Sequence, residues 1–143
     1  MRYQYFIASR WRNKTSALEL TNKIRQRGKT VYCYIEGDGT DYALKKAGED
    51  QTPNDFMKQF ETIPNWQSDP KVKEIFDVDM QALKQSESLI LLLPAGKSSH
   101  IEAGIAYGMR KKCIIIGQQE KTESLYLIFD YFYNSIDEFI SSL

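Results

Sequence analysis

Residues 88–108 read SLILLLPAGKSSHIEAGIAYG, and this stretch decides the fold class. Its first part, Ser88 to Leu93, is apolar at every position after the serine. A strand of this kind is buried on both faces, which is typical of a parallel sheet covered by helices. Pro94 and Gly96 then mark a turn, and a helix is predicted from about Ser98 to Lys112.

The rest of the chain repeats this alternation of strand and helix. Further strands are expected at 3–8, 30–35 and 113–116, an edge strand within the aromatic-rich run 125–133, and helices at 14–27, 72–85 and 135–143. The pattern predicts an α/β, flavodoxin-like, doubly wound parallel sheet of about five strands with helices on both faces. We expect a single domain over residues 1–143, with a loop-rich insertion at about 37–70 that could be helical over 53–60.

Composition narrows the classes of partner. The chain has 143 residues with 19 basic and 19 acidic side chains, hence no net charge. A nucleic-acid polymer is therefore not expected, because phosphate-backbone binding needs a basic face. No membrane span or signal peptide is expected either. Cys33 and Cys113 lie in apolar runs and are interpreted as buried thiols of a reducing compartment, so we expect a cytoplasmic protein.

Ligands of open α/β sheets bind at the carboxyl ends of the strands. Three segments reach that edge: residues 8–13, the insertion after the second strand, and residues 94–102. The segment 94–100 would place backbone amides and hydroxyls at the positive end of a helix dipole, which is an anion-binding geometry. It lacks the P-loop pattern, and a plain loop with a helix cap is an equal alternative.

Carboxylates are the strongest candidates for catalytic residues. Glu102 lies in the first turn of the predicted helix, although its spacing from Ser99 also fits a capping box. Asp77 and Asp79 are placed at the start of the preceding helix, where either could complement the helix dipole, and their spacing lets only one point into the cleft. His100 has no ligand cluster around it, so a metal site is not expected.

Three segments together resemble the nucleoside 2-deoxyribosyltransferase family and its relatives, the deoxynucleoside-monophosphate N-glycosidases. They are Tyr5 to Ser9, the aspartate-headed helix from Asp79 to Glu87, and the glutamate-x-glycine-x-alanine helix from Ile101 to Tyr107. The resemblance covers about two thirds of the chain and leaves the segment 37–70 unmatched.

The resemblance implies N-glycosidic bond cleavage or deoxyribosyl transfer on a nucleoside or nucleoside 5'-monophosphate, without a cofactor. Glu102 would be the nucleophile that forms a glycosyl-enzyme ester. Asp79 would contact the base and deliver or relay a proton to it, and Tyr5 would position Glu102. Water as acceptor gives hydrolysis, and a second nucleobase gives transfer.

One departure from the family bears on the substrate. The transferases carry an aspartate before the glutamate helix to hold the free sugar hydroxyl, whereas this chain has Gly96, Lys97, Ser98 and Ser99 there. That change favours a phosphorylated sugar. Further phosphate candidates follow the first strand, although the arginines could equally be surface charges; they are Ser9, Arg10 and Arg12.

Two other classes of function are compatible with these features. One is a nucleotide-binding or sensing module without turnover, and the other is a signalling-type domain that splits nicotinamide dinucleotides through a helix glutamate. In the resembled family neighbouring subunits complete the sites, so we expect a homo-oligomer in which Asn134 could contribute. Aromatic side chains of the insertion could stack on a base or form a lid: Tyr42, Phe56, Phe60 and Trp66.

Overall fold

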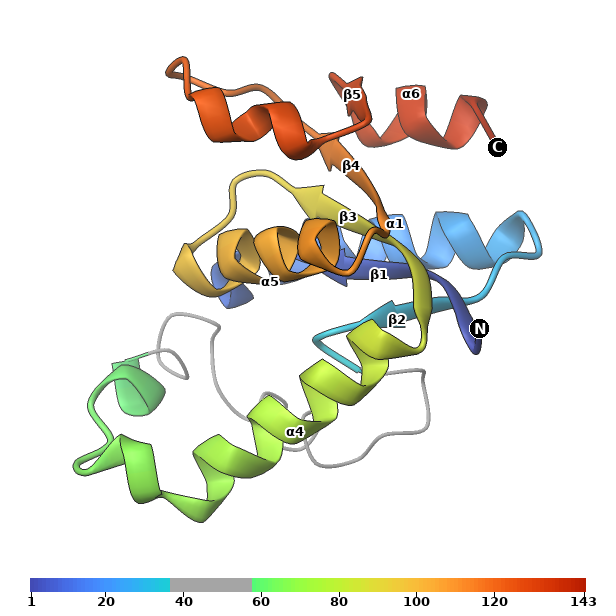
Figure 1. Cartoon of the computed structure of the whole chain (residues 1–143). Helices are drawn as coiled ribbons and strands as arrows, with labels where there is room; N and C mark the ends of the chain where they lie inside the picture. Colours follow the sequence, from blue (N-terminus) through green and yellow to red (C-terminus); the bar gives the residue numbers. More distant parts are fainter. Residues whose placement is uncertain (37–57) are drawn as a thin grey trace.

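The computed structural model describes residues 1–36 and 58–143. Their sheet has five strands: β1 (Tyr3–Ala8), β2 (Val31–Cys33), β3 (Ser86–Leu92), β4 (Lys112–Ile116) and β5 (Tyr131–Tyr133). Every neighbouring pair is parallel and the order is β2-β1-β3-β4-β5 (Figure 1). This is the flavodoxin-like order, with β1 and β3 at the switch point, so the predicted fold class is confirmed.

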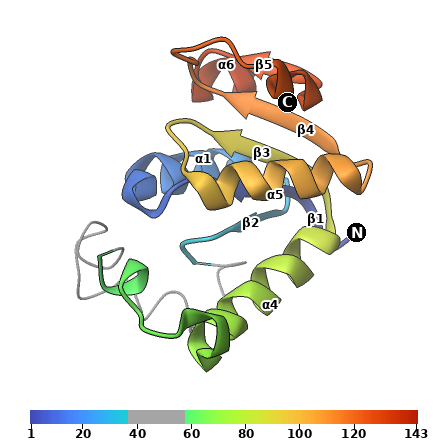
Figure 2. The ribbon, with the colours of Figure 1, turned by 60° about the vertical axis from the view of Figure 1, so that its left-hand side comes forward.

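Helices cover both faces of the sheet (Figures 1 and 2). The α-helices are α1 (Lys14–Gln26), α4 (Pro70–Lys84), α5 (Lys97–Gly108) and α6 (Ile136–Ser141), and the 3-10 helices are η1 (Trp11–Asn13), η2 (Trp66–Ser68) and η3 (Ser124–Ile128). One apolar cluster joins the sheet to α1 and α6, and a second joins its other face to α4 and α5.

The apolar run in β3 has a direct structural cause. Leu89 and Leu91 belong to the cluster with α4 and α5, whereas Ile90 and Leu92 belong to the cluster with α1 and α6. Each of these side chains is at most 2% exposed, and burying one contributes about 1.5–3 kcal/mol. Because both faces are covered, the strand cannot alternate apolar and polar residues.

The cysteines fit the same scheme. Cys33 and Cys113 are free and buried, as predicted, and they lie in the clusters on opposite faces of the sheet. Burial raises the pKa of both thiols, which keeps them protonated.

The edge strand predicted within the C-terminal aromatic run is β5, which takes up only the end of the run. The run contains η3, then the buried Phe129, and only then β5. The Asp130 carboxylate accepts from the Cys113 amide at 2.9 Å, and the Asp130 amide donates to the Cys113 carbonyl at 2.8 Å. These bonds fix the point where β5 joins β4 at the edge of the sheet.

The insertion is described only in its second part. Residues 58–61 are helical, η2 follows, and α4 already begins at Pro70, with the Asp69 carboxylate capping the amides of Lys71 and Val72. The suggestions for Tyr42 and Phe56 lie outside the described residues. None of the helices in the described ranges combines the length and the apolar character that a bilayer crossing requires.

Candidate active site

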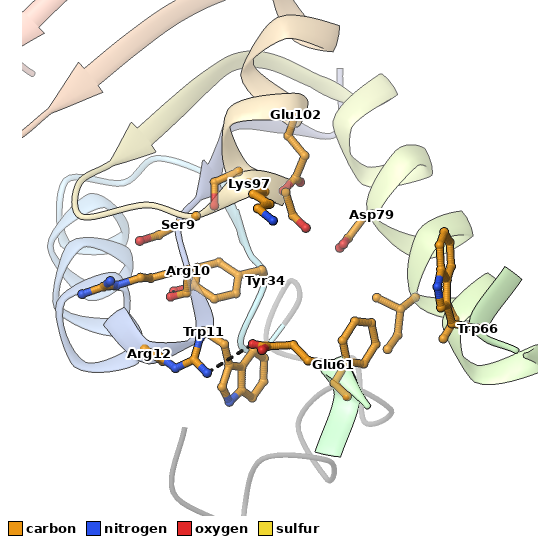
Figure 3. Close-up of a pocket in the computed structure, with 16 residues that line it drawn as sticks. Ser9, Arg10, Trp11, Arg12, Tyr34, Glu61, Trp66, Asp79, Lys97 and Glu102 are labelled. Carbon is orange, nitrogen blue, oxygen red and sulfur yellow. Dashed lines mark hydrogen bonds and ion pairs between the residues drawn. The ribbon is translucent and has the colours of Figure 1, made fainter. Parts of the chain in front are cut away.

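A pocket of about 640 Å³ opens at the carboxyl ends of β1, β2 and β3 (Figure 3). It is lined by Ser9, Arg10, Trp11, Arg12, Tyr34, Phe60, Glu61, Trp66, Val72, Ile75, Asp79, Gly96, Lys97, Ser98, Ser99 and Glu102. The predicted edge of the sheet is therefore the edge that carries the pocket. All three segments predicted to reach it contribute side chains.

Two carboxylates from different helices line this pocket. Glu102 comes from the second turn of α5, and Asp79 comes from the third turn of α4. Burial raises the pKa of Glu102 well above its usual value, and the charge of Asp79 raises it further. Glu102 therefore retains its proton to higher pH than an exposed glutamate does.

The two aspartates of α4 are separated as their spacing predicted. Asp79 lines the pocket, whereas Asp77 is exposed and outside the pocket lining. Their predicted place at the start of the helix is wrong. Asp69 as N-cap and Pro70 at the first position begin α4 earlier, because both residue types favour a helix start.

Tyr5 is not brought to Glu102. Its ring packs edge-on against Phe139 at 5.7 Å between centroids, on the α1 and α6 face of the sheet. Burial raises the pKa of Tyr5, with smaller contributions from Tyr133 and Glu87. The positioning role expected for Tyr5 is therefore corrected, because α5 and Glu102 lie on the opposite face.

Two tyrosines from the second strand run lie near the carboxylates, and the sequence interpretation missed both. Tyr34 lines the pocket, and its hydroxyl donates to the Arg10 carbonyl at 2.7 Å. Burial raises the pKa of Tyr34, and the charge of Glu102 adds to the rise. The Tyr32 hydroxyl donates to Asp79 Oδ1 at 3.4 Å. Their position where β2 ends at the ligand edge is the sequence signal that could have found them.

The first turn of α5 is built differently from the predicted capping box. The N-cap is Gly96, which supplies no side-chain acceptor, and Ser99 is the third residue of the helix and is buried. The amide of His100 donates to the Gly96 carbonyl at 3.2 Å, so the amides of residues 97–99 precede the first intrahelical bond. Glu102 caps nothing in this arrangement and lines the pocket instead.

His100 holds this turn in place. Its Nδ1 donates to the Gly96 carbonyl at 2.8 Å, and its Nε2 accepts from the Tyr126 hydroxyl at 2.9 Å. A carbonyl only accepts, so this contact fixes the tautomer. Within residues 1–36 and 58–143, no group of three or more His, Cys, Asp or Glu side chains is placed to hold a metal ion.

Ser9 ties two loops together. Its hydroxyl donates to the Leu92 carbonyl at 2.8 Å and accepts from Asn13 Nδ2 at 3.1 Å. Ser9 lines the pocket, but its proton is engaged in the protein. It fixes the loop after β1 against the end of β3, whereas a role as hydrogen-bond donor to a ligand was expected.

The remaining lining divides into charged and apolar parts. Arg10, Arg12 and Lys97 supply cationic groups, and Arg12 forms an ion pair with Glu61 at 3.1 Å (Figure 3). Phe60, Trp66, Val72 and Ile75 supply apolar surface from the insertion and α4.

Asn134 is exposed and follows β5, at the edge of the sheet opposite β2. The backbone amide of Asn134 donates to Glu138 Oε2 at 2.8 Å, and Asn134 is outside the pocket lining. A contribution of Asn134 to the site of a neighbouring subunit stays a prediction.

Comparisons with known proteins address the fold. Searches with family models and among curated proteins give no match. Among solved structures the chain is similar to the Clostridium botulinum CMP N-glycosidase BcmB, with 18% identity, a TM-score of 0.52 and 96% of each chain covered. The chain shares the fold of an N-glycosidase. BcmB is thus a distant structural neighbour of this chain.

Proposed function

We propose that this protein hydrolyses the N-glycosidic bond of a nucleoside 5'-monophosphate, with Glu102 as nucleophile. The observation that carries the proposal is the pairing of Glu102 and Asp79 in one pocket whose lining also holds cationic groups and the start of α5. The likeness of the fold to BcmB, named a CMP N-glycosidase, and the resemblance of the three sequence segments support it.

The carboxylate pair suits a two-step reaction. In the first step a Glu102 oxygen bonds to C1' of the sugar and the C1'–N bond breaks. Its electron pair goes to the base nitrogen, which takes the proton from Asp79. In the second step water attacks C1', returns a proton to the pair and releases the sugar phosphate and Glu102. The same ester would pass the sugar to a second nucleobase if one replaced the water.

The charge state of the pair sets the order of events. Glu102 retains its proton in the free protein, yet it must be ionised to attack. Transfer of that proton to Asp79 prepares the nucleophile and the general acid together. A coupled pair that shares one proton can do this without an external base.

The other lining residues suit the two ends of a mononucleotide. A 5'-phosphate can bind at the N-terminus of α5. There it can take hydrogen bonds from the amides of residues 97–99 and from the side chains of Lys97 and Arg10. Trp66, Phe60 and Ile75 offer an apolar surface on which a base can lie. The volume of about 640 Å³ is within the range of small-ligand sites.

The test is to incubate the purified protein with CMP, dCMP, the purine monophosphates, cytidine, deoxycytidine and NAD, and to separate free base by chromatography. We expect base from one or more monophosphates and slower release from the matched nucleoside. Nicotinamide release from NAD alone would replace the proposal with a dinucleotide-splitting activity. Binding of a monophosphate without any free base would make the protein a nucleotide-binding module.

A further inference from the structure

Glu61 stands out among the acidic side chains of the pocket. Of the residues that the structure describes, three carboxylates line it, and two of them, Asp79 and Glu102, are the proposed acid and nucleophile. Glu61 comes from the helical residues 58–61 and pairs with Arg12 of η1. Figure 3 shows this ion pair on the side of Tyr34 away from Glu102.

The Arg12–Glu61 ion pair lowers the positive charge that the pocket can offer to an anion. Lys97, Arg10 and Arg12 line it, and the carboxylate of Glu61 lies 3.1 Å from the Arg12 guanidinium. Glu61 therefore neutralises charge on Arg12, and among the described residues Lys97, Arg10 and the amides that begin α5 can meet an anion. That set matches one phosphate group, whose charge is between −1.5 and −2 near neutral pH.

A second phosphate would meet a different environment. Figure 3 shows the Arg12–Glu61 pair on the side of Tyr34 away from Glu102, so a diphosphate chain that starts at the α5 amides and extends away from Glu102 would approach this pair. There it finds a guanidinium already paired and a carboxylate of its own sign. Both side chains are partly exposed, 37% for Arg12 and 50% for Glu61, so the repulsion acts at moderate strength and depends on salt.

We propose that Glu61 is a specificity-determining residue that limits the ligand to one phosphate, by neutralising Arg12 and repelling the second phosphate of a nucleoside diphosphate. The proposal rests on the proposed function for the location of the phosphate. Glu61 belongs to the segment 37–70, which lies outside the three segments that carry the family resemblance.

The experiment measures the dissociation constants of CMP and CDP by calorimetry for the wild type and for Glu61→Gln. We expect Glu61→Gln to tighten CDP about tenfold, as expected for one partly screened charge pair, and CMP by less than about threefold. The CDP gain should shrink between 20 mM and 500 mM salt. It should vanish in Glu61→Gln combined with Arg12→Gln, because the charge of the Arg12 guanidinium is its source.

Glu19→Gln is the matched control. Glu19 pairs with Lys23 on α1 at 3.0 Å and is 51% exposed, but it is outside the pocket lining. Glu19→Gln should leave the dissociation constants of CMP and CDP unchanged. Equal changes for CMP and CDP in Glu61→Gln, no change at all, or no nucleotide binding by any variant would each overturn the assignment of Glu61. Selective binding without base release would overturn the proposed hydrolysis and leave the assignment standing.

Discussion

Glu102 is the side chain whose protonation decides whether this pocket can act. Burial and the negative charge of Asp79 both raise its pKa, so the free protein holds it neutral over a range in which an exposed glutamate is ionised. A neutral carboxyl is not a nucleophile. The proposed reaction therefore depends on moving one proton within the pair.

This gives a pH prediction with a definite sign. The reactive form of the pair holds one proton, which Glu102 retains in the free protein, so kcat/KM for CMP should fall with rising pH through the raised pKa of Glu102, above the usual glutamate range. Asp79→Asn has no acidic proton to donate and needs only ionised Glu102, so the residual activity of that variant should lack this alkaline limb. A wild-type kcat/KM that does not fall at high pH, or an alkaline limb that Asp79→Asn leaves in place, contradicts this account.

The tyrosines give a second prediction at this scale. Tyr34→Phe removes the hydroxyl that holds the Arg10 carbonyl, and it should lower kcat/KM about tenfold, the value of one buried hydrogen bond. Tyr5→Phe should leave kcat/KM within about twofold, because the Tyr5 ring lies against Phe139. Steady-state kinetics of the two variants decide the ranking. The reverse order would restore Tyr5 as the residue that positions Glu102.

Among the elements, α5 contributes more pocket-lining residues than any other, and its first turn depends on His100. The imidazole joins the Gly96 carbonyl to Tyr126 on η3, so it holds the turn that presents residues 97–99. A serine cap would accept from the amides of this turn, whereas the imidazole donates to the Gly96 carbonyl and so fixes the turn in a different way.

Variants of His100 separate its two contacts. An asparagine amide can replace Nδ1, so His100→Asn should keep the bond to Gly96 and nearly the wild-type KM for CMP. Tyr126→Phe should do the same. A glutamine amide replaces Nε2 instead, so His100→Gln should raise KM about tenfold with little change in kcat. Equal effects of His100→Asn and His100→Gln would show that the Gly96 contact does not matter.

The elements also show how far the sequence could predict this structure. The apolar run of β3 and the periodic helix after it were enough for the fold class and for the edge that carries the pocket. Strand alternation puts Tyr5 and Phe6 on opposite faces, but it does not say which helix covers which face. Local spacing likewise offers both Gly96 and Ser99 as helix caps. The position of Tyr34 after β2 is visible in the sequence, whereas Glu61 reaches the pocket through its contact with the distant Arg12, which no local pattern contains.

At the scale of the whole molecule, the neutral sequence folds into a protein with locally unequal charge. Cationic groups, a carboxylate pair and an apolar wall share one pocket of mononucleotide size. Large apolar side chains are exposed elsewhere: Leu125 at 72%, Leu127 at 84% and Phe132 at 54%. They lie on η3 and β5, away from the pocket lining.

The exposed side chains allow a prediction about assembly. The homo-oligomer expected from the family resemblance should elute above the 16.6 kDa of one chain in size-exclusion chromatography with light scattering. Leu125→Ser combined with Leu127→Ser should shift it towards the monomer if this surface is the interface. A wild-type protein that is monomeric at 50 µM contradicts the expectation.

The central claim is that Glu102 breaks the glycosidic bond. The most direct measurement is the rate of cytosine release from CMP, followed by chromatography, for the wild type, Glu102→Gln and Asp77→Asn. Asp77 is the exposed acidic neighbour of Asp79 outside the pocket lining, so its variant controls for loss of a charge. The account predicts cytosine from the wild type and from Asp77→Asn, and a rate at least about a thousandfold lower from Glu102→Gln. Release by Glu102→Gln at the wild-type rate would contradict it.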